Sequence, residues 1–269
     1  MATQSNFETE TGGASLTIMS SVATIQFNRP AARNAMLYQT WCALPGMIAM
    51  AEQDKCVDLI IMRGKGGHFG AGNDISEFGS LRGDAAGALA FGRAMADAML
   101  AVENATKPVI MAIEGCCYGA SVALGLAGDL RFAADTARFA ITPAKLGALY
   151  LQTDLHRLVA TIGPGQARKM IYTAQTIDAA EARLIGLVDT VVAHDRFDAE
   201  LGQLSQTILR GSPFTLKQSK RMLRNAGLGP AQPETEESLR WFVAALQGED
   251  FAEGYDAFMA KRAPQFRQD

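Results

Sequence analysis

Two short apolar segments, each followed at once by a glycine-rich loop, constrain the fold of this chain more than any other feature. Residues 57–62 (VDLIIM) and 109–113 (VIMAI) are apolar at nearly every position, which is typical of strands buried on both faces of a sheet. Helical patterns follow the two loops, at residues 85–103 and 119–127. This repeated order of strand, loop and helix predicts an α/β core.

The rest of the pattern divides the chain into two regions. Strands are predicted at residues 15–20, 22–27, 130–133 and 137–141, and a helix at 36–52 in spite of Pro45. Beyond residue 146 only 188–192 has a strand pattern, and helices are predicted at 154–161, 165–172, 178–185, 196–209, 213–225, 234–247 and 251–262. We therefore predict a core over residues 1–195 and a helical region over 196–269, with a flexible connection at 227–234.

Charge and composition exclude several classes of function. The chain has 269 residues and a formal net charge of −3, so it lacks the basic balance that a general nucleic-acid binder needs. Residues 1–13 are polar, which predicts no signal peptide, and the apolar stretches are interrupted before the length of a membrane span. We expect a cytoplasmic protein with no membrane partner. The three histidines and four cysteines show no metal-ligand spacing, so we expect no metal site.

The two glycine-rich loops are the strongest candidates for a functional site. Residues 69–75 (FGAGNDI) and 114–121 (EGCCYGAS) each open a helical stretch, and Asp74 is a natural N-cap. Helix N-termini present N–H groups that lack a partner within the helix. Two such groups that donate to one carbonyl oxygen would stabilise negative charge on it. Each donor of this kind typically lowers the activation free energy by ~3–4 kcal/mol. Neither loop has the spacing of a phosphate-binding or dinucleotide-binding motif.

Several segments, in this order, resemble the crotonase, or enoyl-CoA hydratase/isomerase, superfamily. They are residues 25–36 (IQFNRPAARNAM), 68–78 (HFGAGNDISEF), 107–140, 185–192 (IGLVDTVV) and 258–266 (FMAKRAPQF). The resemblance implies an α/β fold, a spiral of ββα units, with a helical C-terminal region that supports trimers or dimers of trimers. It also implies an acyl-CoA thioester as ligand, so that coenzyme A enters as part of the substrate, with no tightly bound cofactor.

The resemblance assigns the oxyanion-binding N–H groups to Asn73 and Ala120. This chain has Gly119-Ala120-Ser121 where the family usually has three glycines, and an N–H survives any substitution except proline. Tyr118 and Ser121 border this position and are expected to line the acyl pocket. The implied contacts to coenzyme A are Arg33, Ala71, Asp74 and Lys261, with a solvated loop cation as the alternative for Arg33 and a helix-surface charge for Lys261.

The positions at which the family carries acids are apolar in this chain. The two hydratase glutamates fall on Ala123 and Pro143, and a further acid of other members falls on Leu151. None of these side chains can move a proton, although all three positions are expected at the substrate pocket. These residues argue against a standard hydratase with two glutamates, while hydratase-type, isomerase-type and decarboxylase-type chemistry all stay open.

Residues 142–150 carry a T-P-x-x-L-G-x-x-Y pattern that also resembles methylmalonyl-CoA decarboxylase members. Tyr150 would there orient the carboxylate or donate a proton, or else fill the acyl pocket as an aromatic side chain. Asp154 is expected as a helix N-cap and His68 as an exposed loop residue. A catalytically weak acyl-CoA-binding protein is the alternative to an enzyme.

Overall fold

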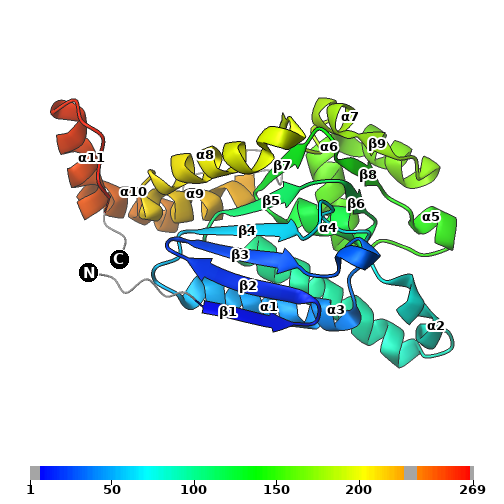
Figure 1. Cartoon of the computed structure of the whole chain (residues 1–269). Helices are drawn as coiled ribbons and strands as arrows, with labels where there is room; N and C mark the ends of the chain where they lie inside the picture. The colour runs from blue at the N-terminus through cyan, green and yellow to red at the C-terminus, as the bar shows by residue number, and fades with distance from the viewer. Residues whose placement is uncertain (1–6, 227–234, 267–269) are drawn as a thin grey trace.

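A seven-stranded mixed sheet organises the computed structural model, which describes residues 7–226 and 235–266 (Figure 1). The strand order is β1-β2-β3-β4-β5-β7-β10, with β1 to β3 antiparallel and β3 to β10 parallel. These strands are β1 (Phe7–Thr11), β2 (Ala14–Met19), β3 (Val22–Phe27), β4 (Leu59–Gly64), β5 (Val109–Ile113), β7 (Leu130–Ala134) and β10 (Thr190–Val192). A smaller sheet contains β6 (Cys116–Tyr118), β8 (Arg138–Ala140) and β9 (Ile177–Asp178).

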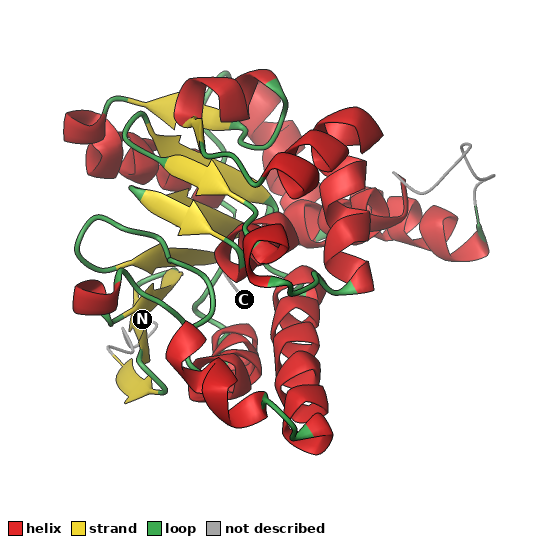
Figure 2. Ribbon diagram, turned by 90° about the vertical axis from the view of Figure 1, so that its right-hand side faces the viewer, coloured by secondary structure: helices red, strands yellow, loops and turns green. Residues whose placement is uncertain are grey.

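Helices cover both faces of the large sheet, which explains why its central strands are apolar throughout (Figure 2). In β4, Ile60 and Met62 join the core beneath α1 (Tyr38–Gln53) and α3 (Ala85–Asn104). The alternate residues Leu59 and Ile61 pack in a second core with α8 (Phe197–Leu209). Because successive side chains of a strand point to opposite faces, a strand between two helical layers must be apolar at every position.

The other helices connect the sheet to the C-terminal region. The single-turn elements are η1 (Pro30–Ala32), η2 (Ile75–Glu77), α2 (Phe78–Leu81), α5 (Pro143–Leu146) and η3 (His194–Arg196). The longer helices are α4 (Ala120–Ala127), α6 (Gln152–Thr173), α7 (Ala179–Leu184), α9 (Pro213–Ala226), α10 (Glu236–Gln247) and α11 (Glu249–Met259). In Figure 1, α11 stands away from the sheet.

Most predicted elements are present, and the differences have local causes. The helices expected at residues 154–161 and 165–172 form the single element α6, which is interrupted at Gly163 by a φ of 73°. The expected connection at residues 227–234 lies outside the described residues. By length and composition alone α3 could cross a membrane, but Phe91, Ala98 and Met99 on it belong to the core. The expectation that every apolar stretch is interrupted before the length of a membrane span is therefore not met by α3, and 28% of its apolar stretch is buried.

Candidate active site

The two glycine-rich loops lie side by side beyond the carboxyl ends of β4 and β5. The N–H of Gly70 donates to the carbonyl of Cys116, and the N–H of Tyr118 donates to the carbonyl of Gly70, both at 2.9 Å. These two bonds form a short parallel bridge between Gly70 and Cys117. The strand order therefore brings together two loops that are about 45 residues apart in the sequence, as expected for neighbouring parallel strands.

Glycine is required where the loops touch. Gly72 has a φ of +91°, and a Cβ atom there would lie 2.8 Å from the carbonyl oxygen of Tyr118 and 3.3 Å from the nitrogen of Ala120. Gly119, at the start of α4, has a φ of +52°. A side chain at Gly72 would push the backbone of the first loop away from the N-terminus of α4.

The predicted donors, Asn73 and Ala120, line one cavity of about 270 Å³. Within the described part of the chain, neither N–H donates a hydrogen bond, whereas the neighbouring groups are occupied. The N–H of Gly72 donates to Ser121 Oγ at 3.0 Å, and the N–H of Asp74 donates to the carbonyl of Met36 at 2.9 Å. Both unpartnered N–H groups are therefore available to an oxygen in the cavity.

The side chain of Asn73 fixes its own backbone. Its Oδ1 accepts from the indole N–H of Trp41 at 2.9 Å, and its Nδ2 lies 3.5 Å from the sulfur of Met95. Trp41 is fully buried in α1. The side-chain amide of Asn73 is thus held in place by core residues and does not act as a mobile hydrogen-bond donor.

Apolar side chains form most of the cavity wall, which suits an acyl chain. They come from the segment around η2 and α2, from α3, and from the segment around α5. They are Ile75, Phe78, Leu81, Phe91, Met95, Pro143, Leu146, Leu149 and Leu151. Tyr150 and Asp154 are the titratable side chains on the part of this wall that the structure describes.

The hydroxyl of Tyr150 is bound to the backbone of the second glycine-rich loop, at Gly119. It donates to the carbonyl oxygen of Gly119 at 2.5 Å, and the N–H of Val122 donates to the same oxygen at 2.9 Å. Burial, with smaller effects of Cys117 and Asp154, raises the pKa of Tyr150 well above its usual value. Tyr150 therefore stays protonated and acts on the peptide between Gly119 and Ala120.

Asp154 is a buried carboxyl group on the wall of the same cavity. Its side chain is 1% exposed, and its Oδ1 accepts from Arg157 Nη1 at 3.0 Å. Its Oδ2 is buried without a hydrogen-bond partner among the described residues. Burial raises the pKa of Asp154 to about 6, against the opposing effects of Arg157 and the N–H of Leu151.

Two sequence-based expectations for single residues are wrong. Asp154 is not an N-cap, because α6 begins at Gln152 with Leu151 as its N-cap, and Asp154 lies buried in the first turn. His68 is not an exposed loop residue, because its Nδ1 accepts the N–H of Cys116 at 3.1 Å and joins the two loops. The partner of His68 lies 48 residues away at Cys116. Asp154 pairs with Arg157 on its own helix, and Arg157 is held in turn by Glu103, 54 residues away.

The structure places the other predicted residues in three groups. Ala71, Pro143 and Leu151 line the cavity. Ser121 and Ala123 are fully buried on α4, and Tyr118, the last residue of β6, is half-buried. All three lie outside the cavity wall. Arg33, Asp74 and Lys261 also lie outside this wall.

The side chains predicted to contact coenzyme A differ in their exposure and in the hydrogen bonds that they already make. Arg33 and Lys261 are exposed, each with a positive φ. Asp74 caps η2 by accepting from the N–H of Ser76, and pairs with Arg29 at 2.9 Å. The hydrogen bonds from Ser76 and Arg29 lower the pKa of Asp74. Its carboxylate is therefore engaged in holding the first loop.

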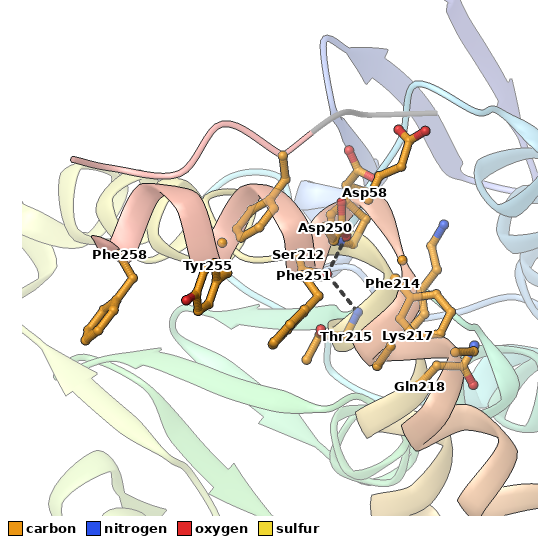
Figure 3. A pocket seen from close by; sticks show the side chains of 17 residues that line it. Asp58, Ser212, Phe214, Thr215, Lys217, Gln218, Asp250, Phe251, Tyr255 and Phe258 are labelled. Carbon is orange, nitrogen blue, oxygen red and sulfur yellow. Dashed lines mark hydrogen bonds between the residues drawn. The ribbon is translucent and has the colours of Figure 1, made fainter. Parts of the chain in front are cut away.

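A second hollow of about 700 Å³ lies in the C-terminal region, away from the two loops (Figure 3). Side chains of α9, α10 and α11 line it together with Phe266. Figure 3 shows Phe251, Tyr255 and Phe258 on one side of α11. Among the described residues, no group of three His, Cys, Asp or Glu side chains is arranged to hold a metal ion.

Comparison with known proteins agrees with this geometry. The enoyl-CoA hydratase/isomerase family profile matches residues 17–269. The chain is 31% identical over 246 residues to the 2,3-dehydroadipyl-CoA hydratase of Escherichia coli (strain K12), covering 91% of this chain and 95% of that protein. It is 29% identical over 258 residues to the peroxisomal Delta(3,5)-Delta(2,4)-dienoyl-CoA isomerase of Arabidopsis thaliana, covering 92% and 93%.

A solved structure assigned to the enoyl-CoA hydratase/isomerase family, from Hyphomonas neptunium, has the same fold. Its TM-score is 0.91 at 38% sequence identity, over 96% of this chain and 98% of that one. The resemblance first drawn from short motifs therefore extends over nearly the whole chain and its three-dimensional arrangement. The chain belongs to the enoyl-CoA hydratase/isomerase family and has the crotonase fold.

Proposed function

We propose that this protein is an enzyme that acts on an acyl-CoA thioester and stabilises a thioester enolate between the N–H groups of Asn73 and Ala120. The observation that supports this most is the convergence of two unpartnered N–H groups on the wall of one apolar cavity. The N-terminus of α4 adds its positive dipole end at Ala120. Donors of this kind stabilise an enolate oxygen more than a neutral carbonyl, so they lower the barrier.

The residues beside the cavity favour isomerase-type or lyase-type chemistry without the two hydratase glutamates. Ala123 is buried behind the site, while Pro143 and Leu151 form part of its wall, and none of them transfers protons. An enolate forms by removal of one proton, by loss of CO2, or by addition of water to a conjugated double bond, and the last route is the one that uses the two hydratase glutamates. A single acid–base group is sufficient for the first route, and the second requires no base.

Decarboxylation of a methylmalonyl-type acyl-CoA is the second candidate. It is favoured by the T-P-x-x-L-G-x-x-Y pattern of residues 142–150 and by the position of Tyr150 on the cavity wall. In this reaction CO2 leaves with its bonding electrons remaining on the carbon, the oxyanion site holds the enolate, and a proton is added last. Release of CO2 from methylmalonyl-CoA is the measurement that would select this candidate.

We also propose how the rest of the ligand and the assembly are arranged. Ala71 borders the cavity and belongs to the same loop as Asn73, which supports a backbone contact to coenzyme A, with Arg33, Asp74 and Lys261 as further contacts. Residues 1–195 form the catalytic core, and residues 196–269 form the oligomerisation region. The assembly is a homotrimer or a dimer of trimers, and Lys261 contacts coenzyme A across a subunit interface.

A proline substitution at Ala120 tests the oxyanion site directly. Ala120 is the first residue of α4, a position at which proline is tolerated. The residue before a proline must be extended, and Gly119, with φ of 52° and ψ of −122°, has the mirror image of an extended conformation, which glycine can adopt equally well. Ala120→Pro removes the N–H, so we expect it to lower turnover at least ~100-fold. Ala120→Gly keeps the N–H and is the matched control, with turnover within a few-fold of the unmodified protein.

The substrate panel consists of crotonyl-CoA, a 3-enoyl-CoA, methylmalonyl-CoA and a saturated acyl-CoA in D2O, each followed by mass spectrometry. Crotonyl-CoA hydration at ordinary enzyme rates would contradict the loss of glutamate chemistry. Tight binding of all esters with no product would leave a binding protein. If no ester binds, the proposed function is wrong.

A further inference from the structure

Asp154 has a position, a partner and an unsatisfied oxygen that neither the family positions nor the oxyanion site explain. It lies eleven positions after Pro143 and three after Leu151, so it coincides with none of the three acid positions considered above. On the part of the cavity wall that the structure describes, Asp154 is the only residue that carries a carboxyl group. A buried carboxyl oxygen without a hydrogen-bond partner is costly, and such groups are retained where they serve a purpose.

We propose that Asp154 is the proton-transfer residue of this enzyme, with its carboxyl group as the reacting group and Arg157 as its positioning residue. This proposal rests on the proposed function. The carboxylate would remove a proton from a carbon next to the thioester carbonyl or conjugated with it. The C–H bond breaks, an O–H bond forms on Asp154, and the electron pair moves to the thioester oxygen held by Asn73 and Ala120. Return of that proton to the same or another conjugated carbon completes an exchange or a double-bond shift.

The neighbours of Asp154 are arranged to hold it and leave one oxygen unpaired. Arg157 donates to Oδ1 from the same helix, and its Nε donates to Glu103 of α3 at 3.1 Å. Glu103 therefore holds the guanidinium in place, and the guanidinium holds one carboxyl oxygen. The remaining oxygen has no donor competing with a substrate proton among the described residues.

The charges around Asp154 predict the pH dependence of the reaction. The groups that face it are Arg157 on its own helix, Glu103 on α3 and the Tyr150 hydroxyl, while Lys145 on α5 is exposed. Burial raises the pKa of Asp154 to about 6. A base with this pKa is ionised at pH 7.5 and loses activity as the pH falls below about 6.

Exchange of α-protons is the direct test, measured as deuterium uptake by butyryl-CoA in D2O. We expect Asp154→Asn to slow uptake at least ~100-fold, and Asp154→Glu to restore part of it. Arg157→Met leaves the carboxyl group without its cation, so the acid limb of the pH profile should move to higher pH. A role limited to folding would not move that limb.

The infrared carbonyl frequency of bound butyryl-CoA separates the two proposals. A frequency lowered by binding in the unmodified protein and in Asp154→Asn, together with lost exchange in the variant, supports Asp154 as the proton-transfer residue. A lowered frequency with exchange as fast in Asp154→Asn as in the unmodified protein overturns that role and leaves the oxyanion site intact. No change of frequency in the unmodified protein overturns the proposed function itself.

Discussion

The peptide bond between Gly119 and Ala120 connects the side chain of Tyr150 to the proposed oxyanion site. Its carbonyl oxygen accepts hydrogen bonds from Tyr150 and from the N–H of Val122, and its N–H faces the cavity. Hydrogen bonds to a carbonyl polarise the whole peptide group, so its N–H becomes a stronger donor. Tyr150 is therefore suited to strengthen the N–H of Ala120 without touching the reacting carbon.

Tyr150→Phe tests this contribution. Loss of one hydrogen bond to the Gly119 carbonyl, worth about 0.5–1.5 kcal/mol, should lower kcat roughly 2–10-fold while the Kd for a substrate analogue changes little. Steady-state rates and calorimetric binding measure the two quantities. An unchanged kcat would contradict the polarisation argument. A complete loss confined to methylmalonyl-CoA decarboxylation would instead indicate that Tyr150 orients the carboxylate.

At the scale of elements, the start of α6 carries a cost in stability that depends on pH. Asp154 has a pKa of about 6 in the folded protein and an ordinary value of 3.8. Between these two pH values Asp154 is ionised in the unfolded chain and protonated in the folded protein. The contribution of Asp154 to the free energy of unfolding is therefore full below pH 4 and is lost as the pH rises through 6. The loss amounts to about 3 kcal/mol.

Denaturant unfolding at pH 4.5 and pH 7.5 measures this effect. The free energy of unfolding of the unmodified protein should fall relative to that of Asp154→Asn as the pH rises, because the variant lacks this titration. Asp178→Asn, at the N-cap of α7, is the matched control and should not show that relative fall. Parallel pH dependence in the unmodified protein and Asp154→Asn would contradict an elevated pKa.

The sequence pattern of a segment predicted those elements whose own residues indicate a strand or helix. It did not predict elements that are defined by pairing with distant residues. The run VIMAI predicted β5 with its bounds, since a strand covered on both faces is apolar throughout. The three-residue strand β6 has no such pattern, because its pairing with β8 defines it. The resemblance to the family suggested Asn73 and Ala120 as donors, and both line the cavity, whereas Asp154 became a candidate only once its burial and the Arg157–Glu103 pair beside it were seen.

At the scale of the whole molecule, the C-terminal helices leave apolar side chains uncovered. Phe242 on α10 is 63% exposed and Phe258 on α11 is 81% exposed. Phe258 lines the hollow of Figure 3 together with Phe251 and Tyr255. Large apolar side chains that gather on exposed helices are a feature of subunit interfaces. The proposed oligomer would cover this surface with a second copy of the chain.

A double substitution, Phe242→Glu with Phe258→Glu, tests this interface. Two charges on a surface that must be desolvated should dissociate the assembly at micromolar concentration, while the core of residues 1–195 keeps its fold. Sedimentation velocity should give three or six chains for the unmodified protein and one for the variant. Leu184→Glu on α7 is the matched control, since Leu184 is 86% exposed but lies outside the C-terminal helices, and it should leave the assembly unchanged. A monomeric unmodified protein would contradict the proposed role of residues 196–269, and it would also remove the basis for a contact of Lys261 with coenzyme A across subunits.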